Sequence, residues 1–467
     1  MKTESGVEWS NWAGTEHCRP ARICYPSSRA DLVEIVDEAR HKGLKVRVAG
    51  RGHSMGPLSV TGGYLVLLDR LERIGPIDTA RRLVTIEAGV TIGALDRVLR
   101  RHGLAMPTNV VLTDVRYGGV IATGCHGAGW DSPTICDLVE AVTIVTYDGR
   151  VVRFSEASHG AEVMNAVRCN LGAFGIMHEI VLRVEPMFHL AANDRRLPMV
   201  AFEDPAGLRD YVSGNDYVEA FWLPMADGLW AKSWNRTAAP ARRTSRGRPA
   251  ADLLSTEFMK LLWRWMRAHP AATGPINRFL YRSFIPEDRT VVLDAADALH
   301  YRDHISRIPV HIMSFAIKVD PDCANIQRAW QLIIDRARAH AGEGRYPLNL
   351  MIELRAIGAS DVLLSPAAGK AGEHHCYFEV LSFSRTPGHR EFFDEVALGW
   401  MAMPELVARP HWAKYFYDIP GIIPHIHRVW GDNLKRFAAI RDDLDPLDMF
   451  LNPALERIIY GESATER

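Results

Sequence analysis

The sequence predicts an α+β protein built from two domains. A chain of 467 residues is longer than a single hydrophobic core usually supports. Its composition, with 47% hydrophobic and 24% charged residues, is typical of a globular protein in water. In the first 190 residues, short β-branched runs alternate with amphipathic segments, and this regular alternation ends at about residue 191. We therefore expect a first domain over residues 1–190 and a second domain after it.

The elements of the first domain follow from local patterns. SSRADLVEIVDEARHKG combines a serine cap, helical apolar spacing and a glycine stop, so it predicts a helix over 27–43 that leads to the strand KVRVAG at 45–50. LVTIEAG (83–89) predicts a strand, and VTIGALDRVLRRHG (90–103) predicts a helix ending in glycine. VEAVTIVTYDGRVVRF (139–154) predicts a hairpin around a Tyr-Asp-Gly turn.

The second domain contains less regular sequence. TAAPARRTSRGRPAA (237–251) lacks periodicity and predicts a mobile surface loop. In the helix expected after it, basic residues alternate with leucines and tryptophans: Lys260, Leu261, Leu262, Trp263, Arg264, Trp265 and Arg267. Such a helix can lie at a lipid surface, but it is commoner as ordinary packing or as a lid over a pocket. Peripheral membrane contact stays open beside that interpretation.

Composition argues against several partners. A formal net charge of -1 and a pI near 7.0 give no basic field that would attract nucleic acid, although local patches stay open. Seven cysteines without a CxxC pair argue against a disulfide framework and favour a reducing cytoplasm. The N-terminal MKTESGVEWSNWAG lacks the apolar core of a signal peptide, and nowhere do 18 apolar residues follow one another as in a membrane span.

Three glycine-rich segments indicate a long ligand that lies against main chain. They are GRGHSMGPLS (50–59), GGVIATGCHGAG (118–129) and NLGAFG (170–175), which precedes a predicted strand. Glycine tolerates positive φ and has no Cβ, so successive N–H groups can converge on a pyrophosphate. The GxGxxG order of a Rossmann unit is absent. A dinucleotide bound without a Rossmann unit points to FAD.

These segments carry a family resemblance. Together with RPARICYPSSRADLVEIV (19–36), RPHWAKYF (409–416) and RFAAIRDDLDPLDMFLNP (436–453), the chain resembles the vanillyl-alcohol-oxidase (PCMH) type of FAD-dependent oxidoreductase, in its aldonolactone oxidase and alditol oxidase branch. The resemblance implies an FAD-binding domain over 1–190, a substrate (cap) domain over 191–419 built on an antiparallel sheet covered by helices, and a segment 420–467 that returns to the FAD domain. The flavin ring would lie between the domains.

The resemblance also implies a binding mode for FAD. His53 matches the histidine that joins the 8α-methyl of the flavin covalently, whereas without the family it reads as an ordinary loop histidine. Some relatives form a second flavin bond through a cysteine that lies before the corresponding glycines. Cys125 instead lies after the glycine pair at 118–119, so we expect a single covalent bond, with Cys125 as a small residue beside the flavin. The expected FAD-contacting residues are Gly50, Arg51, Gly52, His53, Ser54, Met55, Ser59, Gly118, Gly119, Ala122, Thr123, Gly124, Cys125, His126, Gly127, Gly175 and Ile176.

Oxidation of an alcohol by hydride transfer needs a base at the hydroxyl and positive charge where negative charge accumulates. Strand alternation in NLMIELRAIG places Glu353 and Arg355 on one face, and the pair matches the family's Glu-x-Arg strand; the alternative is an exposed charge pair. Lys414 matches the lysine of the family's HWxK motif, and the alternative is a solvated loop lysine. The histidine of alditol-oxidising relatives is replaced by Glu379, which puts polyol specificity in doubt. We predict Lys414, Glu353, Arg355 and Glu379 as the catalytic group.

The resemblance predicts oxidation of a C–OH group of a sugar-derived lactone, polyol or related alcohol, with O2 as acceptor. Relatives that use O2 often have glycine or proline in the segment that here reads TNVVLTD (108–114), so Val110 and Val111 favour as the alternative a dehydrogenase with a quinone or other acceptor. A more hydrophobic alcohol, a flavin-linked epimerase and a noncatalytic flavin binder are further alternatives. EHHC (373–376) suggests a metal, but adjacent histidines on a strand face opposite ways, so we expect no metal site.

Overall fold

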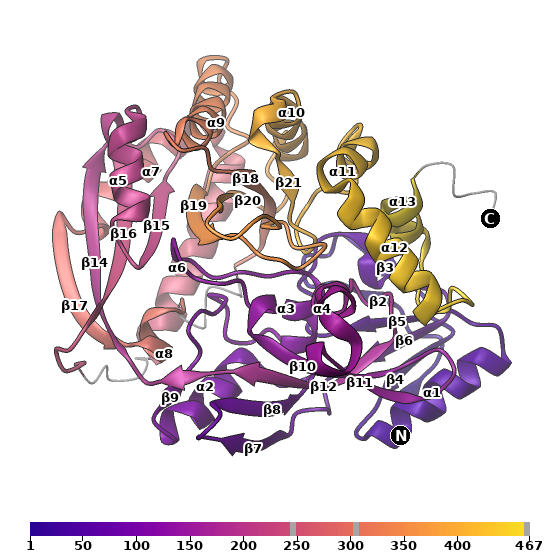
Figure 1. The fold of residues 1–467 in the computed structure, drawn as a ribbon. Helices are drawn as coiled ribbons and strands as arrows, with labels where there is room; N and C mark the ends of the chain where they lie inside the picture. The colour runs from indigo at the N-terminus through magenta and orange to yellow at the C-terminus, as the bar shows by residue number, and fades with distance from the viewer. Residues whose placement is uncertain (243–248, 302–307, 462–467) are drawn as a thin grey trace.

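A computed structural model describes residues 1–242, 249–301 and 308–461 (Figure 1). Its N-terminal part contains a four-stranded sheet in the order β1-β4-β6-β5, in which β4, β6 and β5 run parallel. The predicted helix over 27–43 is α1, and its Ser28 cap accepts a hydrogen bond from Asp31 N. The elements are β1 (Lys2–Glu4), β2 (Trp9–Ser10), β3 (His17–Cys18), β4 (Arg22–Tyr25), α1 (Arg29–His41), β5 (Val46–Ala49) and β6 (Tyr64–Leu67).

A second, antiparallel sheet completes this part of the fold in the order β11-β10-β12-β8-β7. The predicted hairpin is β10–β11, and the predicted strand and helix over 83–103 are β8 and α2; these predictions are confirmed. The elements are β7 (Ile74–Asp78), β8 (Leu83–Glu87), α2 (Ile92–Arg101), β9 (Leu104–Ala105), α3 (Tyr117–Ala122), β10 (Val139–Val145), β11 (Val151–Ser155), α4 (Glu156–Val167), β12 (Ile176–Arg183) and β13 (Glu185–Pro186).

An antiparallel sheet of eight strands follows, in the order β17-β14-β16-β15-β19-β20-β18-β21, as the predicted fold class requires. Helices α5, α9 and α10 cover one face (Figure 1), where Trp330 packs against Phe378. The elements are β14 (His189–Pro198), α5 (Pro205–Ser213), β15 (Tyr217–Trp222), β16 (Gly228–Thr237), α6 (Pro249–Ala268), α7 (Thr273–Phe284), β17 (Asp288–Asp294), α8 (Ala295–Ala298), β18 (Val310–Lys318), α9 (Ala324–Gly342), β19 (Met351–Gly358), β20 (His374–Phe383), α10 (His389–Met401) and β21 (Arg409–Pro410).

The middle of the predicted loop over 237–251 lies outside the described residues, because 243–248 are not described. On either side of that gap, β16 ends at Thr237 and α6 begins at Pro249. Only the flanks of the predicted loop can therefore be compared with the structure, and its mobility stays a prediction.

The last helices, α11 (Ile422–Trp430), α12 (Asp432–Leu444) and α13 (Pro453–Tyr460), lie against the N-terminal part (Figure 1). Val46 N donates to Met449 O, and the Asn452 amide donates to the carbonyl oxygens of Pro57 and Val60. The end of the chain therefore braces the strand and loop that carry the first glycine segment. The division at residues 190 and 419 stays a prediction.

Candidate active site

A cavity of about 500 Å³ separates the glycine segments from the eight-stranded sheet. One wall is mostly main chain from the three glycine segments. The other carries charged side chains from β16, β19 and β20, together with Lys414 and Tyr301. Glu219 of β15 lies behind this wall, in contact with Arg355. We call the two walls the glycine wall and the sheet wall. A dinucleotide on the first would present its ring to the charges on the second.

The glycine wall has local reasons for its conformation. Gly52 has φ +69°, a left-handed conformation that other residues adopt only with strain, and its ideal Cβ would lie 3.4 Å from Trp9. Gly118 lies in the short helix α3 rather than in the loop expected there, and a Cβ at this position would lie 2.9 Å from Ala88 O. The left-handed conformation therefore explains Gly52, and close approach of main chain explains Gly118.

Most predicted FAD-contacting residues line the cavity, and three do not. Those that line it are Gly50, Arg51, Gly52, His53, Ser54, Met55, Ser59, Gly118, Gly119, Ala122, Thr123, Cys125, His126 and Gly175. Gly124, Gly127 and Ile176 lie outside it. Gly127 instead accommodates a neighbouring segment, because a Cβ there would lie 2.1 Å from Thr108 Oγ1. Sequence motifs mark the segments of the wall but do not tell lining residues from supporting ones.

His53 lies in this wall with its ring stacked on Trp12, at 4.7 Å between centroids. Its Nε2 is buried, has no hydrogen-bond partner within the described ranges, and lies 4.0 Å from Asp114 Oδ2. Burial lowers the pKa of His53 to about 4, although Asp114 opposes the shift. The imidazole is therefore neutral at physiological pH, the form that acts as a nucleophile.

Cys125 also lines the cavity, and its Sγ lies 3.4 Å from Thr123 Oγ1. Burial raises the pKa of this thiol to about 11. Because the thiolate is the reactive form, Cys125 is chemically quiet at neutral pH. This agrees with its expected place as a small residue beside the cofactor.

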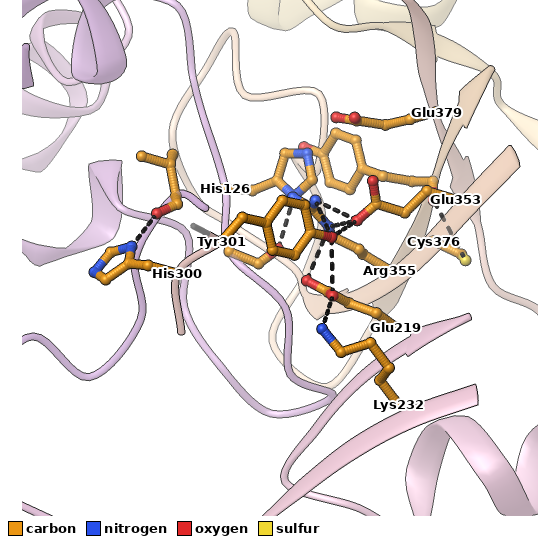
Figure 2. A network of polar contacts seen from close by, with 12 residues as sticks. His126, Glu219, Lys232, His300, Tyr301, Glu353, Arg355, Cys376 and Glu379 are labelled. Carbon is orange, nitrogen blue, oxygen red and sulfur yellow. Dashed lines mark hydrogen bonds and ion pairs between the residues drawn. The ribbon is translucent and has the colours of Figure 1, made fainter. Parts of the chain in front are cut away.

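The sheet wall brings Glu353 and Arg355 together on β19, and both side chains are buried, at 2% and 4% exposure. The alternative of an exposed charge pair is therefore wrong. Arg355 Nε donates to Glu353 Oε1 at 2.5 Å and lies 3.3 Å from Glu219 Oε1, on the neighbouring strand β15. The Tyr301 hydroxyl lies between the two carboxylates, 2.7 Å from Glu353 and 3.0 Å from Glu219 (Figure 2).

A second ion pair joins Lys414 Nζ to Glu379 Oε1 at 3.5 Å. Glu379 lies on β20 directly opposite Glu353, and Lys414 lines the same cavity, with its side chain 20% exposed. The alternative of a solvated loop lysine is therefore wrong. Trp412, two residues before Lys414, is a fully buried core residue whose indole donates to Leu364 O.

The two carboxyls on neighbouring strands are tuned in opposite directions. Burial raises the pKa of Glu353 to about 7, helped by the charges of Glu219 and Glu379 and opposed by Arg355. Burial also acts to raise the pKa of Glu379, but Lys414 and Arg355 together lower it to about 2. At neutral pH Glu379 is a fixed anion, whereas Glu353 exchanges a proton readily. Glu353 therefore has the pKa of a general base.

Three residues in or behind the sheet wall escaped sequence reasoning. Glu219 lies in the apolar run YVEAFW, where an isolated acid is a signal that could have been followed. Lys232 Nζ lies 3.6 Å from Glu219 Oε2 (Figure 2). It also lies over the rings of Trp234 and Tyr301, at 4.7 and 5.2 Å. Tyr301 follows α8 in irregular chain, and no local pattern marks it.

Two further features concern the predictions about oxygen and metal. Val110 and Val111 both line the cavity, and the Val110 carbonyl is 2.7 Å from His300 Nδ1. His374 stacks on Trp130 while His375 is buried, so the two face opposite sides of β20. Across residues 1–242, 249–301 and 308–461, no cluster of three metal-ligating side chains occurs.

The comparisons with known proteins identify the family. Residues 20–155 match the model of the FAD binding domain, and residues 180–458 match that of D-arabinono-1,4-lactone oxidase. The chain belongs to the D-arabinono-1,4-lactone oxidase family. The fold-class prediction, the resemblance and FAD as cofactor are thereby confirmed.

Relatives of this family differ in the electron acceptor that their names imply. The chain is 27% identical to L-gulonolactone oxidase of Bos taurus and 28% identical to L-gulono-1,4-lactone dehydrogenase of Mycobacterium tuberculosis, covering 97% of this chain and 99% of each relative. In fold it is similar to cholesterol oxidase from B. sterolicum, with a TM-score of 0.83 at 18% identity over 98% of this chain and 97% of the other.

Membership in the family makes the protein an FAD-dependent oxidoreductase that acts on CH–OH donors. The glycine wall fits this cofactor, because it offers close main chain and an unpartnered, neutral imidazole at His53. The sheet wall opposite supplies Glu353, whose pKa is raised to about 7, and the cations Arg355 and Lys414 at the same cavity. A binding protein without a reaction would not need that second wall.

Proposed function

We propose that this protein oxidises a hydroxyl-bearing carbon of a sugar-derived lactone, or of a closely related polyol, with O2 as electron acceptor. One observation carries the proposal: Glu353, with a pKa of about 7, lies beside Arg355 in the cavity that the glycine wall closes. The family relatives named for gulonolactone and arabinonolactone support the class of substrate.

Bound FAD supplies the hydride acceptor at N5. In the reaction that we propose, Glu353 accepts the proton of the substrate hydroxyl at Oε1 or Oε2, so that the C–H bond becomes a hydride donor. Arg355 and Lys414 stabilise the negative charge that develops, and Glu379 holds the Lys414 ammonium in place. His126 and His411 add hydrogen-bonding groups that stay neutral, because burial lowers their pKa values, that of His411 to about 3.

Anaerobic bleaching of the yellow flavin tests the proposal. L-Gulono-1,4-lactone, D-arabinono-1,4-lactone, a polyol and a hydrophobic alcohol are mixed separately with the holoenzyme without oxygen. We expect a lactone to bleach the flavin fastest. Failure of every lactone and polyol to reduce it would refute the proposal.

The apolar part of the sheet wall favours a second candidate substrate. Met259, Ile308, Val310, Leu350 and Leu381 all line the cavity, and a sugar lactone offers little apolar surface to match them. A more hydrophobic alcohol would bury more area there. Faster bleaching by the hydrophobic alcohol than by any lactone would select this candidate.

Val110 and Val111 favour a second candidate acceptor, a quinone or other non-oxygen compound. Their β-branched side chains line the cavity, where they can obstruct the approach of O2 to reduced flavin. Admitting air after anaerobic reduction distinguishes the two: an oxidase regains its colour at once, whereas a dehydrogenase does so slowly. We expect Val110→Ala to speed reoxidation if the side chain is the obstruction, and Val151→Ala, at an exposed position of β11 outside the cavity, serves as the control.

We also propose that His53 joins the flavin covalently, on the strength of its neutral, unpartnered Nε2 in the glycine wall. Acid precipitation of the wild type should leave the yellow colour in the pellet. His53→Ala should release it to the supernatant. Release of FAD from the wild type would refute the covalent bond at His53 but would not bear on the proposed reaction.

A peripheral lipid contact is proposed at α6 and α7, on a protein that otherwise resides in the cytoplasm. Five exposed large apolar side chains lie there: Phe258, Leu261, Trp265, Phe279 and Phe284. Lys260, Arg264 and Arg267 give the same helix positive charge, as anionic lipid requires. Within the described ranges no helix combines the length and apolarity of a bilayer span. Sedimentation with anionic vesicles should capture the wild type and lose Leu261→Ser; equal capture by neutral vesicles would contradict the proposal.

A further inference from the structure

The Tyr301 hydroxyl faces more hydrogen-bond acceptors than it can serve. It lies 2.7 Å from Glu353 Oε1 and 3.0 Å from Glu219 Oε2, and Figure 2 shows it between the two carboxyl groups. A phenol has one proton and donates to one acceptor at a time. Two ionised carboxylates at these distances would leave one oxygen facing the phenol oxygen with no hydrogen between them. One of the two carboxyls must therefore carry a proton of its own.

The surroundings decide which carboxyl that is. Lys232 Nζ lies 3.6 Å from Glu219 Oε2, so Glu219 has a cation beside it. Glu353 is buried, and its acidic neighbours Glu219 and Glu379 oppose the effect of Arg355, whose Nε lies 2.5 Å from Glu353 Oε1. The direction of its pKa agrees, since these effects raise it to about 7. The protonated Glu353 then donates to the Tyr301 oxygen, and the Tyr301 hydroxyl donates to Glu219.

We infer that Glu353, Tyr301 and Glu219 share one proton in addition to the phenol's own, and that this proton resides on Glu353 when the site is at rest. It leaves Glu353 before this carboxylate accepts the proton of the substrate hydroxyl, and Tyr301 and Glu219 are positioning residues acting through Glu353. The inference rests on the proposed function, in which Glu353 handles the proton of the substrate hydroxyl. No oxidation state changes in this step, because only an O–H bond breaks at one oxygen and forms at another. The chain runs from the cavity to Lys232, whose side chain is 15% exposed.

Within residues 1–242, 249–301 and 308–461, five charged groups lie around Glu353. They are Glu219 on β15, Lys232 on β16, Arg355 on β19, Glu379 on β20 and Lys414 after β21. With every acid ionised, the three carboxylates balance the three cations. Protonation of Glu353 leaves one positive charge in excess on the wall that faces the cofactor. The ionisation state of Glu353, which decides whether it can accept a proton, is therefore linked to the net charge of the site.

Two variants should move the pH dependence in opposite directions. Glu219→Gln removes an anion beside Glu353, so the acidic limb of anaerobic flavin reduction against pH should shift down by about one unit. Tyr301→Phe removes the hydrogen bond that favours ionised Glu353, so the limb should shift up by a similar amount. Tyr211→Phe is the matched control, because its hydroxyl donates to the main-chain carbonyl of Glu219 rather than to a carboxylate. It should leave the profile in place.

Infrared difference spectra provide a readout that needs no substrate. In the holoenzyme, the carbonyl stretch of a protonated carboxyl should disappear between about pH 6 and 8, and it should be missing in Glu353→Gln. Shifts of the same sign in both variants, no shift in either, or no protonated carboxyl in the wild type would overturn the inference. A titrating band in an enzyme that no lactone reduces would instead refute the proposed function and leave the shared proton intact.

Discussion

The two walls of the cavity are built in opposite ways. The glycine wall is made of main chain from segments that are each contiguous in sequence, and His53 is its main ionisable ring. The sheet wall is made of side chains from several strands together with Tyr301 and Lys414 from irregular chain, and its charged network reaches from Glu219 to Lys414. Holding a cofactor needs shape, which a short motif encodes. Proton transfer needs carboxylates and cations close together, and pairing between strands brings these side chains into contact.

The largest effect should come from removing the proton acceptor of the sheet wall. Glu353→Gln keeps the shape and hydrogen-bonding capacity of the side chain but cannot accept the hydroxyl proton. We expect the anaerobic rate of flavin reduction to fall about 10²–10⁴-fold, the usual contribution of a general base, with flavin content unchanged. Stopped-flow absorbance measures both quantities.

Glu373→Gln provides the matched control, because Glu373 pairs with Lys318 at the start of β20, away from the cavity. A rate within twofold of the wild type is expected there. A Glu353→Gln enzyme that reduces its flavin normally would mean that the sheet wall does not supply the base. The comparison between the walls would then fail at its main point.

The sheet wall should also make stability depend on pH. Burial lowers the pKa of both His375 and His411 to about 3, far below the ordinary value of about 6.5. Below pH 6.5 the two histidines bind protons in the unfolded state but stay neutral in the folded state. Their contribution to the free energy of unfolding is therefore fully present above pH 6.5 and is lost as the pH falls toward 3. We expect each histidine to cost about 2 kcal/mol between pH 7 and pH 5. Urea unfolding at the two pH values measures the loss.

The control for this loss uses histidines inside and outside the core. His375→Gln should flatten the dependence, whereas His102→Gln, at the exposed end of α2, should leave it unchanged. A wild type equally stable at pH 5 and pH 7 would contradict the prediction.

The contrast between the walls also explains what the sequence could predict. The helix at Ser28, the hairpin around Gly149 and the strand that carries Glu353 and Arg355 depend on neighbours close in sequence, and all three are found. Lys414 was reachable because it lies in a motif. Glu219, Lys232 and Tyr301 were not, because their meaning comes from pairing between β15, β16 and β19. Local rules give elements, whereas a charge network depends on register across a sheet.

The same limit appears inside the glycine wall, at a finer scale. Gly124 and Gly127 belong to the motif, but they support neighbouring chain instead of lining the cavity. A Cβ at Gly124 would lie 3.1 Å from Cys169 Sγ and from Pro366 Cδ, contacts that lie far away in sequence. The motif thus identifies which segment approaches a ligand, and the packing behind it decides which residue does.

The smallest effect should come from a single change in the glycine wall. Gly52→Ala places a side chain at φ +69°, which costs about 1 kcal/mol or more, and the loop can relieve this strain by turning its N–H groups away from the cavity. We expect FAD affinity to fall about fivefold in a His53→Ala background, where binding is reversible, as measured by flavin fluorescence. Gly103→Ala is the matched control, since Gly103 has φ +66° with open space around it and lies outside the cavity. Equal losses of affinity in both variants would show that strain alone, and not the main chain of the glycine wall, controls binding.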